Sequence, residues 1–386
     1  MFIYLHIPFC VSHCIYCDFY VVLEKYGGKD AYVDAVCREI DLRFATIDPA
    51  QFPEGIQTLY VGGGTPSLLS SQAYRKIFSA LNRYLPFASD AEITLEANPG
   101  ATRSEMADAP ENYRAVGFNR VSVGVQSFNN LELKKLSRLH SAQEAIDFIK
   151  RLKTAGWDNI SLDLMYGIPC QSRDSWRQTL NQAIELDVQH ISMYGLKVEE
   201  NTPLEKLTRH ASARGAYPLP EEDDVVDMYH DGLKQLTNAG FQRYEFSNLA
   251  KPNRHSRHNL NYWDNGEFLA LGVAAHGYWQ GNRYETVRDI KTYLQNPLAG
   301  EQFPCPSEER LENAIIFGLR KAEGIHIPSL EAEFGLDFRQ KYHHILQRYH
   351  DYFQWNDPYL QLTEAAIPLS NIILAEFLND ETDLHE

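Results

Sequence analysis

Apolar and polar residues follow one another along the first two-thirds of the chain in a pattern that predicts alternating strands and helices. Phe2–Ile7 is rich in β-branched and aromatic residues and predicts a strand, whereas Ala31–Ala45 has apolar side chains at helical spacing. Gln57–Val61 predicts a second strand, which ends at the glycine run Gly62–Gly64. Strands joined by crossover helices are the units from which parallel sheets are built.

The same alternation continues to about residue 250. Further strands are predicted over Glu92–Ala97, Arg120–Val125, Asn159–Met165, His190–Leu196 and Gln242–Phe246. Further helices are predicted from a cap at Ser70 to about Leu85, and over Arg103–Val116, Ala142–Ala155 (capped by Ser141), Arg173–Leu186 and Glu221–Ala239. Six clear strand–helix units are fewer than the eight of a closed barrel. We therefore predict an α/β fold whose parallel sheet forms an open or partial TIM-type (β/α)6 barrel.

After about Gly300 the pattern changes to helices and one short hairpin. Helices are predicted over Ser307–Lys321, Ile327–Phe334, Arg339–Tyr352 and about Glu364 to Leu378, and a hairpin over Trp355–Leu362. This order predicts a C-terminal α+β appendage of winged-helix type, and residues 380–386 are predicted to be a frayed acidic tail. We divide the chain into residues 1–250 (the partial barrel), 251–300 (a connecting segment) and 301–386 (a C-terminal domain).

Charge and hydropathy limit the classes of function. The chain has 36 Lys and Arg against 52 Asp and Glu, a net charge of −16, so it repels phosphate backbones and general nucleic-acid binding is not expected. It contains no run of about 18 apolar residues, so we expect no membrane span. The first residues lack the basic region and long apolar core of a secretion signal, which predicts a cytoplasmic protein.

Three of the six cysteines lie within eight residues, in Cys10-Val-Ser-His-Cys14-Ile-Tyr-Cys17, directly after the first predicted strand. In a reducing compartment such clustering indicates metal binding rather than disulfides. Three thiolates this close can hold one iron–sulfur cluster, and no fourth thiolate follows, because Asp18 and Phe19 come next. One iron would then be open to an exogenous ligand. The alternatives are free thiols and structural zinc, for which His13 would have to be the fourth ligand.

Glycine and polar residues follow the ends of several predicted strands. The run Gly62–Gly64 lets a ligand approach the backbone closely, or else forms only a tight turn. Glu96 could accept hydrogen bonds from an amino or ribose group, or be a solvated strand end. Gln126, Arg138 and Asp163 are expected at the barrel mouth, where carboxyl ends of parallel strands bind ligands, although Arg138 could be an ordinary helix residue.

The spacing Cys-x3-Cys-x2-Cys after a first strand resembles the cluster motif of the radical S-adenosylmethionine (SAM) superfamily. Along essentially the whole chain the sequence resembles the coproporphyrinogen dehydrogenase branch of that superfamily, and within it the haem chaperones of the HemW family. The motifs that carry this resemblance are Tyr4-Leu-His-Ile-Pro-Phe-Cys10, Gly62-Gly-Gly-Thr-Pro-Ser67, Glu96-Ala-Asn-Pro-Gly100, Gly124-Val-Gln-Ser-Phe128, Asp163-Leu-Met-Tyr-Gly-Ile-Pro169, His258-Asn-Leu-Asn-Tyr-Trp263, Gly272-x3-His276-Gly277 and Leu362-Thr363…Leu369-Ser-Asn371.

The resemblance implies a [4Fe–4S] cluster held by Cys10, Cys14 and Cys17, whose open iron chelates the amino and carboxylate groups of SAM. It also implies that electron transfer cleaves the sulfonium and yields a 5′-deoxyadenosyl radical. The residues that it implies as SAM contacts are Tyr4, Tyr16, Gly63, Gly64, Thr65, Glu96, Gln126, Arg138 and Asp163. The chain departs from the family pattern at one of these, because Leu-Gly-Arg is replaced by Leu136-Ser-Arg138.

Two departures separate the chain from oxygen-independent coproporphyrinogen III oxidases. Those enzymes have a fourth cysteine where this chain has Phe19, and they carry a long arm before the first strand, which here is predicted to begin at residue 2. We therefore expect a haem chaperone that binds haem and SAM and delivers haem to client proteins such as respiratory enzymes, and the family implies a homodimer. The alternatives are the oxidase, which decarboxylates propionates by radical chemistry, and a non-catalytic iron–sulfur scaffold protein.

A haem carrier needs an axial ligand, most simply an imidazole. His258 is our candidate, because it lies among aromatic residues and near Arg254 and Arg257, which could meet haem propionates. His255 and His276 are rival candidates. The alternative for His258 is a packed histidine without a ligand.

Overall fold

The computed structural model describes residues 1–100, 106–209 and 217–378, and a nine-stranded sheet with the order β11-β1-β4-β5-β6-β7-β8-β10-β9 forms its centre. The strands are β1 Phe2–Ile7, β4 Ile56–Gly63, β5 Phe87–Ala97, β6 Arg120–Gln126, β7 Ile160–Tyr166, β8 His190–Gly195, β9 Gln242–Arg243, β10 Asn248–Ala250 and β11 Leu269–Leu271. In this order, each strand from β11 through β8 is parallel to its neighbour, whereas β10 and β9 at the other edge pair antiparallel. The predicted α/β fold with a parallel sheet is confirmed, and within the described residues the strand order does not close into a ring.

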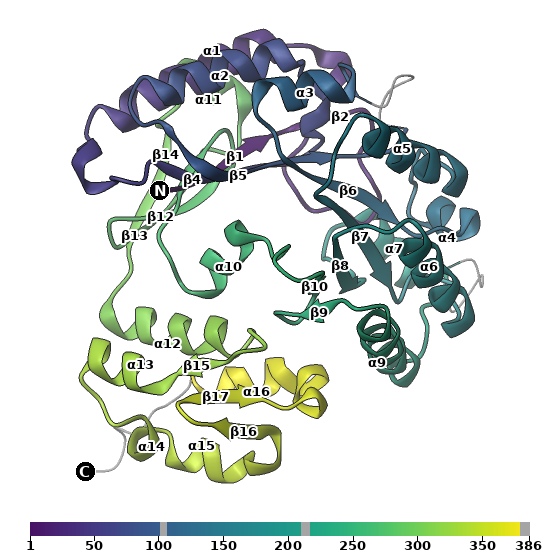
Figure 1. Cartoon of the computed structure of the whole chain (residues 1–386), viewed down its shortest axis with the longest axis vertical. Helices are drawn as coiled ribbons and strands as arrows, with labels where there is room; N and C mark the ends of the chain where they lie inside the picture. Colours follow the sequence, from purple (N-terminus) through teal and green to yellow (C-terminus); the bar gives the residue numbers. More distant parts are fainter. Residues whose placement is uncertain (101–105, 210–216, 379–386) are drawn as a thin grey trace.

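Long helices lie along the convex side of this sheet (Figure 1). They are α1 Lys29–Phe44, α2 Ser71–Asn82, α3 Pro110–Val116, α5 Ala142–Thr154, α6 Arg173–Glu185 and α9 Glu222–Asn238, with the shorter α4 Asn130–Lys135 and α7 Pro203–Arg209 between them. Both predicted caps are confirmed, because Ser70 accepts from the Ala73 amide and Ser141 forms a capping box with Glu144. The third helix is shorter than predicted and begins at Pro110; residues 101–105 lie outside the described part of the chain.

The six central parallel strands each present one apolar and one polar face, as the period-two geometry of a strand requires. The face toward the helices carries the buried side chains Ile3, Leu5, Ile7, Leu59, Val61, Ile93, Leu95, Val121, Val123, Ile160, Leu162, Ile191 and Met193. The concave face carries Tyr4, His6, Thr58, Tyr60, Glu92, Thr94, Glu96, Arg120, Ser122, Ser161, Asp163, His190, Ser192 and Tyr194. A sheet with one polar, concave face needs partners for those groups, and they come from the segments that fill its hollow.

The segment 251–300, expected to be a connection, contributes to both sheet and hollow. It contains α10 Arg257–Trp263, α11 Ile290–Gln295, the edge strand β11, and the strands β12 His276–Trp279 and β13 Asn282–Thr286 of an antiparallel sheet, whose third strand, β14 Gly300–Pro304, begins at the last residue of the segment. α10 lies on the concave side of the main sheet (Figure 1). The strands here are three to five residues long, too short for the pattern of apolar positions to reveal them.

The C-terminal region has the predicted α+β character. It contains α12 Ser307–Gly318, α13 Ile327–Phe334, α14 Phe338–Lys341, α15 His343–Arg348 and α16 Ser370–Glu376, with the sheet β15 (Ile325–His326), β17 (Tyr359–Leu362) and β16 (Phe353–Asn356). The hairpin is confirmed as β16–β17. The predicted helices over 339–352 and 364–378 are wrong as single helices: the first is broken into α14, α15 and a 3-10 turn, and the second begins as a 3-10 helix that contains Pro368. The predicted acidic tail, 380–386, lies outside the described residues.

Some smaller elements complete the description. β2 Phe9–Cys10 pairs in parallel with β3 Val22–Leu23, and 3-10 helices lie over Glu24–Tyr26, Pro49–Gln51, Pro66–Leu68, His350–Tyr352 and Glu364–Leu369. In the part of the chain that the structure describes, every helix is too short or too polar to cross a lipid bilayer.

One buried carboxylate fixes α10 inside the hollow. Glu92 of β5 accepts from the Ser256 hydroxyl (3.3 Å) and from the backbone amides of Arg257 (3.1 Å) and His258 (3.2 Å). The first amides of a helix have no partner within the helix, and a carboxylate is favoured at this positive end. The strand therefore holds the start of the helix by charge-assisted hydrogen bonds.

Glu92→Gln is expected to destabilise the fold by about 1–3 kcal/mol, because an amide places an N–H donor where two backbone amides need acceptors. Urea denaturation followed by circular dichroism would measure the loss. Glu301→Gln, a change at an exposed residue of the edge strand β14, is the matched control and should leave the midpoint unchanged. Equal midpoints for the two variants would refute the assigned role of Glu92.

Candidate functional site

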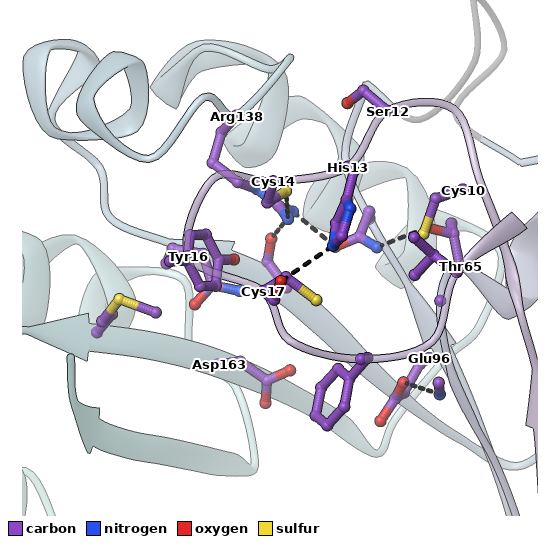
Figure 2. A pocket seen from close by; sticks show the side chains of 18 of the residues that line it. Cys10, Ser12, His13, Cys14, Tyr16, Cys17, Thr65, Glu96, Arg138 and Asp163 are labelled. Carbon is purple, nitrogen blue, oxygen red and sulfur yellow. Dashed lines mark hydrogen bonds between the residues drawn. The ribbon is translucent and has the colours of Figure 1, made fainter. Parts of the chain in front are cut away.

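The cysteine motif forms a loop over the carboxyl ends of the parallel strands (Figure 2). The β2–β3 pair closes the base of the loop, and the Cys17 amide donates to the Cys14 carbonyl (3.2 Å) inside it. His13 is exposed, and its Nε2 is hydrogen-bonded to the Cys17 carbonyl (3.0 Å) rather than turned toward the thiols. This nitrogen is therefore not available as the fourth ligand of a zinc site.

The described side chains around the cysteine loop do not form a site for a single metal ion. Among the described residues, no three His, Cys, Asp or Glu side chains converge closely enough to hold one metal ion. A cubane cluster bonds each thiolate to a different iron, so its ligands lie further apart than those of one zinc ion. Burial raises the pKa of the Cys10 and Cys17 thiols to about 11, which favours their protonated form at neutral pH.

The glycine run after β4 brings backbone against the first cysteine. A Cβ atom on Gly64 would lie 2.7 Å from the Phe9 carbonyl oxygen and 3.0 Å from Cys10 Sγ, so only glycine fits there. Gly63 has φ +114°, which also requires glycine. The next residue, Thr65, places its hydroxyl 3.7 Å from Cys10 Sγ. The strand end thus forms a close-fitting wall beside Cys10.

Arg138 brings a guanidinium to the second cysteine. Its Nη1 donates to Cys14 Sγ (3.6 Å), and its Nη2 donates to Asn98 Oδ1 and to the Gly124 carbonyl (both 2.6 Å). Its Nε is buried and has no hydrogen-bond partner among the described residues. The preceding Ser137 has φ +57°, a conformation that glycine adopts without strain. Ser137 therefore keeps the backbone shape that glycine would give, and Arg138 still reaches the site.

Two carboxylates lie below the loop on the concave face (Figure 2), one on β5 and one on β7, with β6 between them. Glu96 accepts from the Tyr60 hydroxyl (2.8 Å) and the Gly63 amide (3.1 Å), and Asp163 accepts from the Ser122 hydroxyl (3.1 Å). Burial, and then the negative charge of Asp163, raise the pKa of Glu96 to about 7, and burial also raises the pKa of Asp163. A ligand with a positive charge would favour the ionised form of both groups.

The end of β6, between the strands of the two carboxylates, has a strained backbone. Gln126, at the end of β6, has φ +70° and follows a shift of register between β6 and β7. Its side-chain oxygen accepts from the Tyr194 hydroxyl (2.6 Å). Strained backbone of this kind persists only where surrounding contacts hold it, and it often marks ligand sites.

These groups line one cavity of about 480 Å³. All but one of the residues predicted to bind the cluster or SAM line this cavity. They are Cys10, Cys14, Cys17, Tyr16, Gly63, Gly64, Thr65, Glu96, Gln126, Arg138 and Asp163. Tyr4 does not line this cavity; its hydroxyl is hydrogen-bonded to His6 Nδ1 (3.1 Å) and its ring stacks on Tyr60. Cys37, Cys170 and Cys305 also lie outside it.

Several residues that line the cavity were not predicted from the sequence, namely Tyr60, Asn98, Ser122, His140 and Tyr194. The strand residues among them could have been predicted from the sequence, because polar side chains recur at every second position of otherwise apolar strands. Asn98 and His140 follow strand or helix ends, where no periodic pattern exists.

His258, the predicted haem ligand, is buried in the hollow of the sheet, with 1 % of its surface exposed. Its Nδ1 is hydrogen-bonded to Thr58 Oγ1 (2.7 Å) and its Nε2 to Tyr262 Oη (2.8 Å), and its ring stacks on Tyr60. Burial lowers the pKa of its imidazole to about 3, so the ring is neutral. Because both nitrogens already have partners and no surface is free, this geometry counts against iron ligation by His258.

Comparison with protein families gives two matches. The model of the radical SAM superfamily matches residues 4–183, and the model of the HemN C-terminal domain matches residues 305–369. The residues of the cavity described above lie almost entirely within the first of these ranges.

Comparison with named proteins gives relatives along most of the chain. The heme chaperone HemW of Lactococcus lactis is 33 % identical over 383 residues, which cover 98 % of this chain and 97 % of the relative. The heme chaperone HemW of Escherichia coli is 42 % identical over 278 residues, covering 71 % of this chain and 69 % of the relative. Among solved structures, coproporphyrinogen III oxidase (HemN) from Escherichia coli, a radical SAM enzyme, is similar to this chain with a TM-score of 0.80 and 22 % sequence identity. The match covers 97 % of this chain and 89 % of the oxidase chain. The last similarity shows a shared fold.

The raised pKa of Glu96 predicts a pH-dependent stability. Because the folded-state pKa (about 7) lies above the value of 4.5 expected for an unfolded chain, Glu96 contributes stability below about pH 4.5 that is lost as the pH rises through about 7. The free energy of unfolding of the wild type, relative to that of Glu96→Gln, should therefore fall by roughly 3 kcal/mol across this range. Urea titrations at several pH values would measure it, with the exposed change Glu301→Gln as control. Parallel curves for the wild type and Glu96→Gln would contradict the prediction.

Proposed function

The chain belongs to the heme chaperone HemW family within the radical SAM superfamily, and on that premise we propose that it binds haem and SAM and passes haem to client proteins. The superfamily implies a [4Fe–4S] cluster and SAM as cofactors. We assign the cluster to Cys10, Cys14 and Cys17 and the SAM site to the cavity beneath them.

The chemistry of the cavity supports the SAM assignment. SAM carries a sulfonium and an ammonium group, both positive, and the ionised carboxylates of Glu96 and Asp163 would be neutralised by them. The bound cluster would supply the electron that SAM cleavage requires. Around it, Gly64 leaves room beside Cys10, and Arg138 places its guanidinium next to Cys14.

One observation carries the choice between haem chaperone and oxidase. The residue two positions after Cys17 is Phe19, whose apolar side chain is 62 % exposed at the rim of the cavity, where the oxidases that the chain resembles have a fourth cysteine. A phenyl ring cannot ligate metal or exchange a proton or hydrogen atom with a substrate. It offers instead an apolar surface, of the kind that a porphyrin face covers.

Delivery of haem to clients such as respiratory enzymes, and a homodimeric state, belong to the same proposal. The names of the relatives support the first of these. A scaffold without catalytic or ligand-binding role is a weaker alternative, because strained Gln126 and the buried carboxylates would be a cost without benefit in such a protein.

Replacement of any one of Cys10, Cys14 or Cys17 by Ser is expected to abolish cluster assembly, because each thiolate binds a different iron. Anaerobic reconstitution followed by iron and sulfide analysis should give about four irons per wild-type chain and well under one in each variant. Cys37→Ser is the matched control, since Cys37 lies outside the cavity, and it should keep the wild-type content. Full iron content in all three variants would sink the assignment.

The proposed function is tested by giving the reconstituted, reduced chain SAM and coproporphyrinogen III under anaerobic conditions and reading the products by mass. We expect no loss of carboxyl groups, while the same preparation binds haem with a Soret band and restores activity to a haem-depleted respiratory enzyme. An established oxygen-independent coproporphyrinogen III oxidase is the positive control. Stoichiometric decarboxylation would make the chain an oxidase, and failure to bind haem would end the chaperone proposal.

A further inference from the structure

A second cavity, of about 560 Å³, lies beside β1 on the other side of Asp18 and Phe19. Its walls come from β1, the end of the cysteine loop, α10, the β12–β13 hairpin and α12, so it lies where the C-terminal region meets the sheet. Asp18 and Phe19 line both cavities, and the other residues that line the second do not line the first. Its volume is in the range of pockets for medium-sized organic ligands.

The lining of this cavity suits a flat, apolar ligand. Half of its residues are aromatic, among them Phe19, Tyr262, Trp263, Phe268 and Phe317. Aromatic rings in open cavities gain most when another planar surface covers them. Trp263 also presents a buried indole N–H, at Nε1, that has no hydrogen-bond partner among the described residues. A ligand with an acceptor at its edge would satisfy that donor.

Two arginines add positive charge to the same cavity. Arg283 of β13 donates through Nε to Glu309 (3.0 Å) and lies over the Tyr278 ring, while its side chain is 38 % exposed. Arg288 is exposed and has no ion-pair partner among the described residues. Asp18 is the only acidic residue in the lining. A cavity with aromatic walls and two guanidinium groups fits a planar ligand whose edge carries carboxylates.

Two histidines line the cavity, and only one of them has a ring nitrogen without a partner among the residues that the structure describes. His6 is buried, with Nδ1 bonded to Tyr4 and Nε2 3.5 Å from the Tyr20 carbonyl, and burial lowers the pKa of its imidazole to about 4. The side chain of His276 is 64 % exposed, and its Nδ1 lies 3.6 Å from Glu285 Oε2. This distance is longer than a hydrogen bond, so the carboxylate lies beside the exposed ring without fixing it.

His276 therefore differs from His258 in having a ring nitrogen that is open to a ligand. No residue in the described ranges is hydrogen-bonded to Nε2 of His276, whereas both nitrogens of His258 are engaged and Tyr262 is the partner of its Nε2. Tyr262 itself lines the aromatic cavity, and His258 does not. The buried histidine thus supports the wall through Tyr262, and the exposed one is open to a ligand.

We infer that this aromatic cavity is the haem site, with His276 as an iron ligand and Arg283 and Arg288 facing the two propionates. The inference rests on the proposed haem-binding function and gives it a place distinct from the cluster cavity. The ligand class is an iron porphyrin with free carboxylates.

The test is a haem titration of the full-length chain, followed by its Soret band. His276→Ala should weaken haem binding at least about tenfold and change the Soret maximum, because an axial ligand is lost, and added imidazole should restore the wild-type spectrum. His350→Ala is the matched control, since His350 is also an exposed histidine next to a carboxylate, at 3.2 Å from Asp351, and lies outside the cavity. It should bind haem as the wild type does.

A second variant tests the cavity without changing the proposed iron ligand. Arg283→Gln combined with Arg288→Gln should weaken binding of metal-free protoporphyrin about tenfold, and should not alter binding of its dimethyl ester, which has no charged carboxylates. Wild-type affinity and spectrum in His276→Ala, or equal loss for acid and ester in the arginine variant, would overturn the inference. Absence of haem binding by the wild type would instead overturn the proposed function, so the two failures are distinguishable.

Discussion

The parallel register of β1 on β4 is the constraint on which the rest of this molecule depends. His6 lies opposite Gly62 and Ile7 opposite Gly63, so the cysteine loop that follows β1 begins beside the glycine run that ends β4. A shift of one residue would move Gly64 away from Cys10 and would also turn Tyr4 and His6 toward the helices. The apolar side chains of β1 prevent that slip, because Ile3, Leu5 and Ile7 are completely buried. Packing on one face of the sheet therefore sets the geometry of the site at its end.

The polar side chains on the concave face destabilise the folded protein unless other groups form hydrogen bonds with them. Arg120 is buried there with two guanidinium nitrogens that have no hydrogen-bond partner among the described residues, and such groups destabilise a folded protein. Helix α10 reduces this destabilisation, because it gives hydrogen-bond partners to other polar groups of the face. Glu92 accepts from the amides at the start of the helix, and His258 of the helix is hydrogen-bonded to Thr58. The helix closes the hollow on the side where the strands begin. The hollow stays open where the strands end, and the cluster cavity lies there.

The sequence predicted what depends on local patterns. Strands of six or more residues and helices with caps such as Ser141 were found because their periodicity is read over many positions. Most predicted site residues line one cavity, and they were named from the sequence because spaced thiols and glycine runs have few other uses. The edge strand β11 and the β12–β14 sheet were missed because they are short, and their place depends on long-range pairing. The environment of His258 was also beyond local patterns: its partner Thr58 is 200 residues away in the chain.

Ser137 shows how tertiary structure resolves what a motif leaves open. The sequence alone offers a serine where the family pattern has glycine, and nothing local says whether the backbone keeps its course. The structure gives Ser137 a φ of +57° and brings Arg138 to Cys14, because three acceptors fix the guanidinium. The same reasoning applies to Asp18 and Phe19, which lie next to Cys17 and line both cavities. The two cavities therefore share one short segment of backbone, and the residues after Cys17 belong to the walls of both.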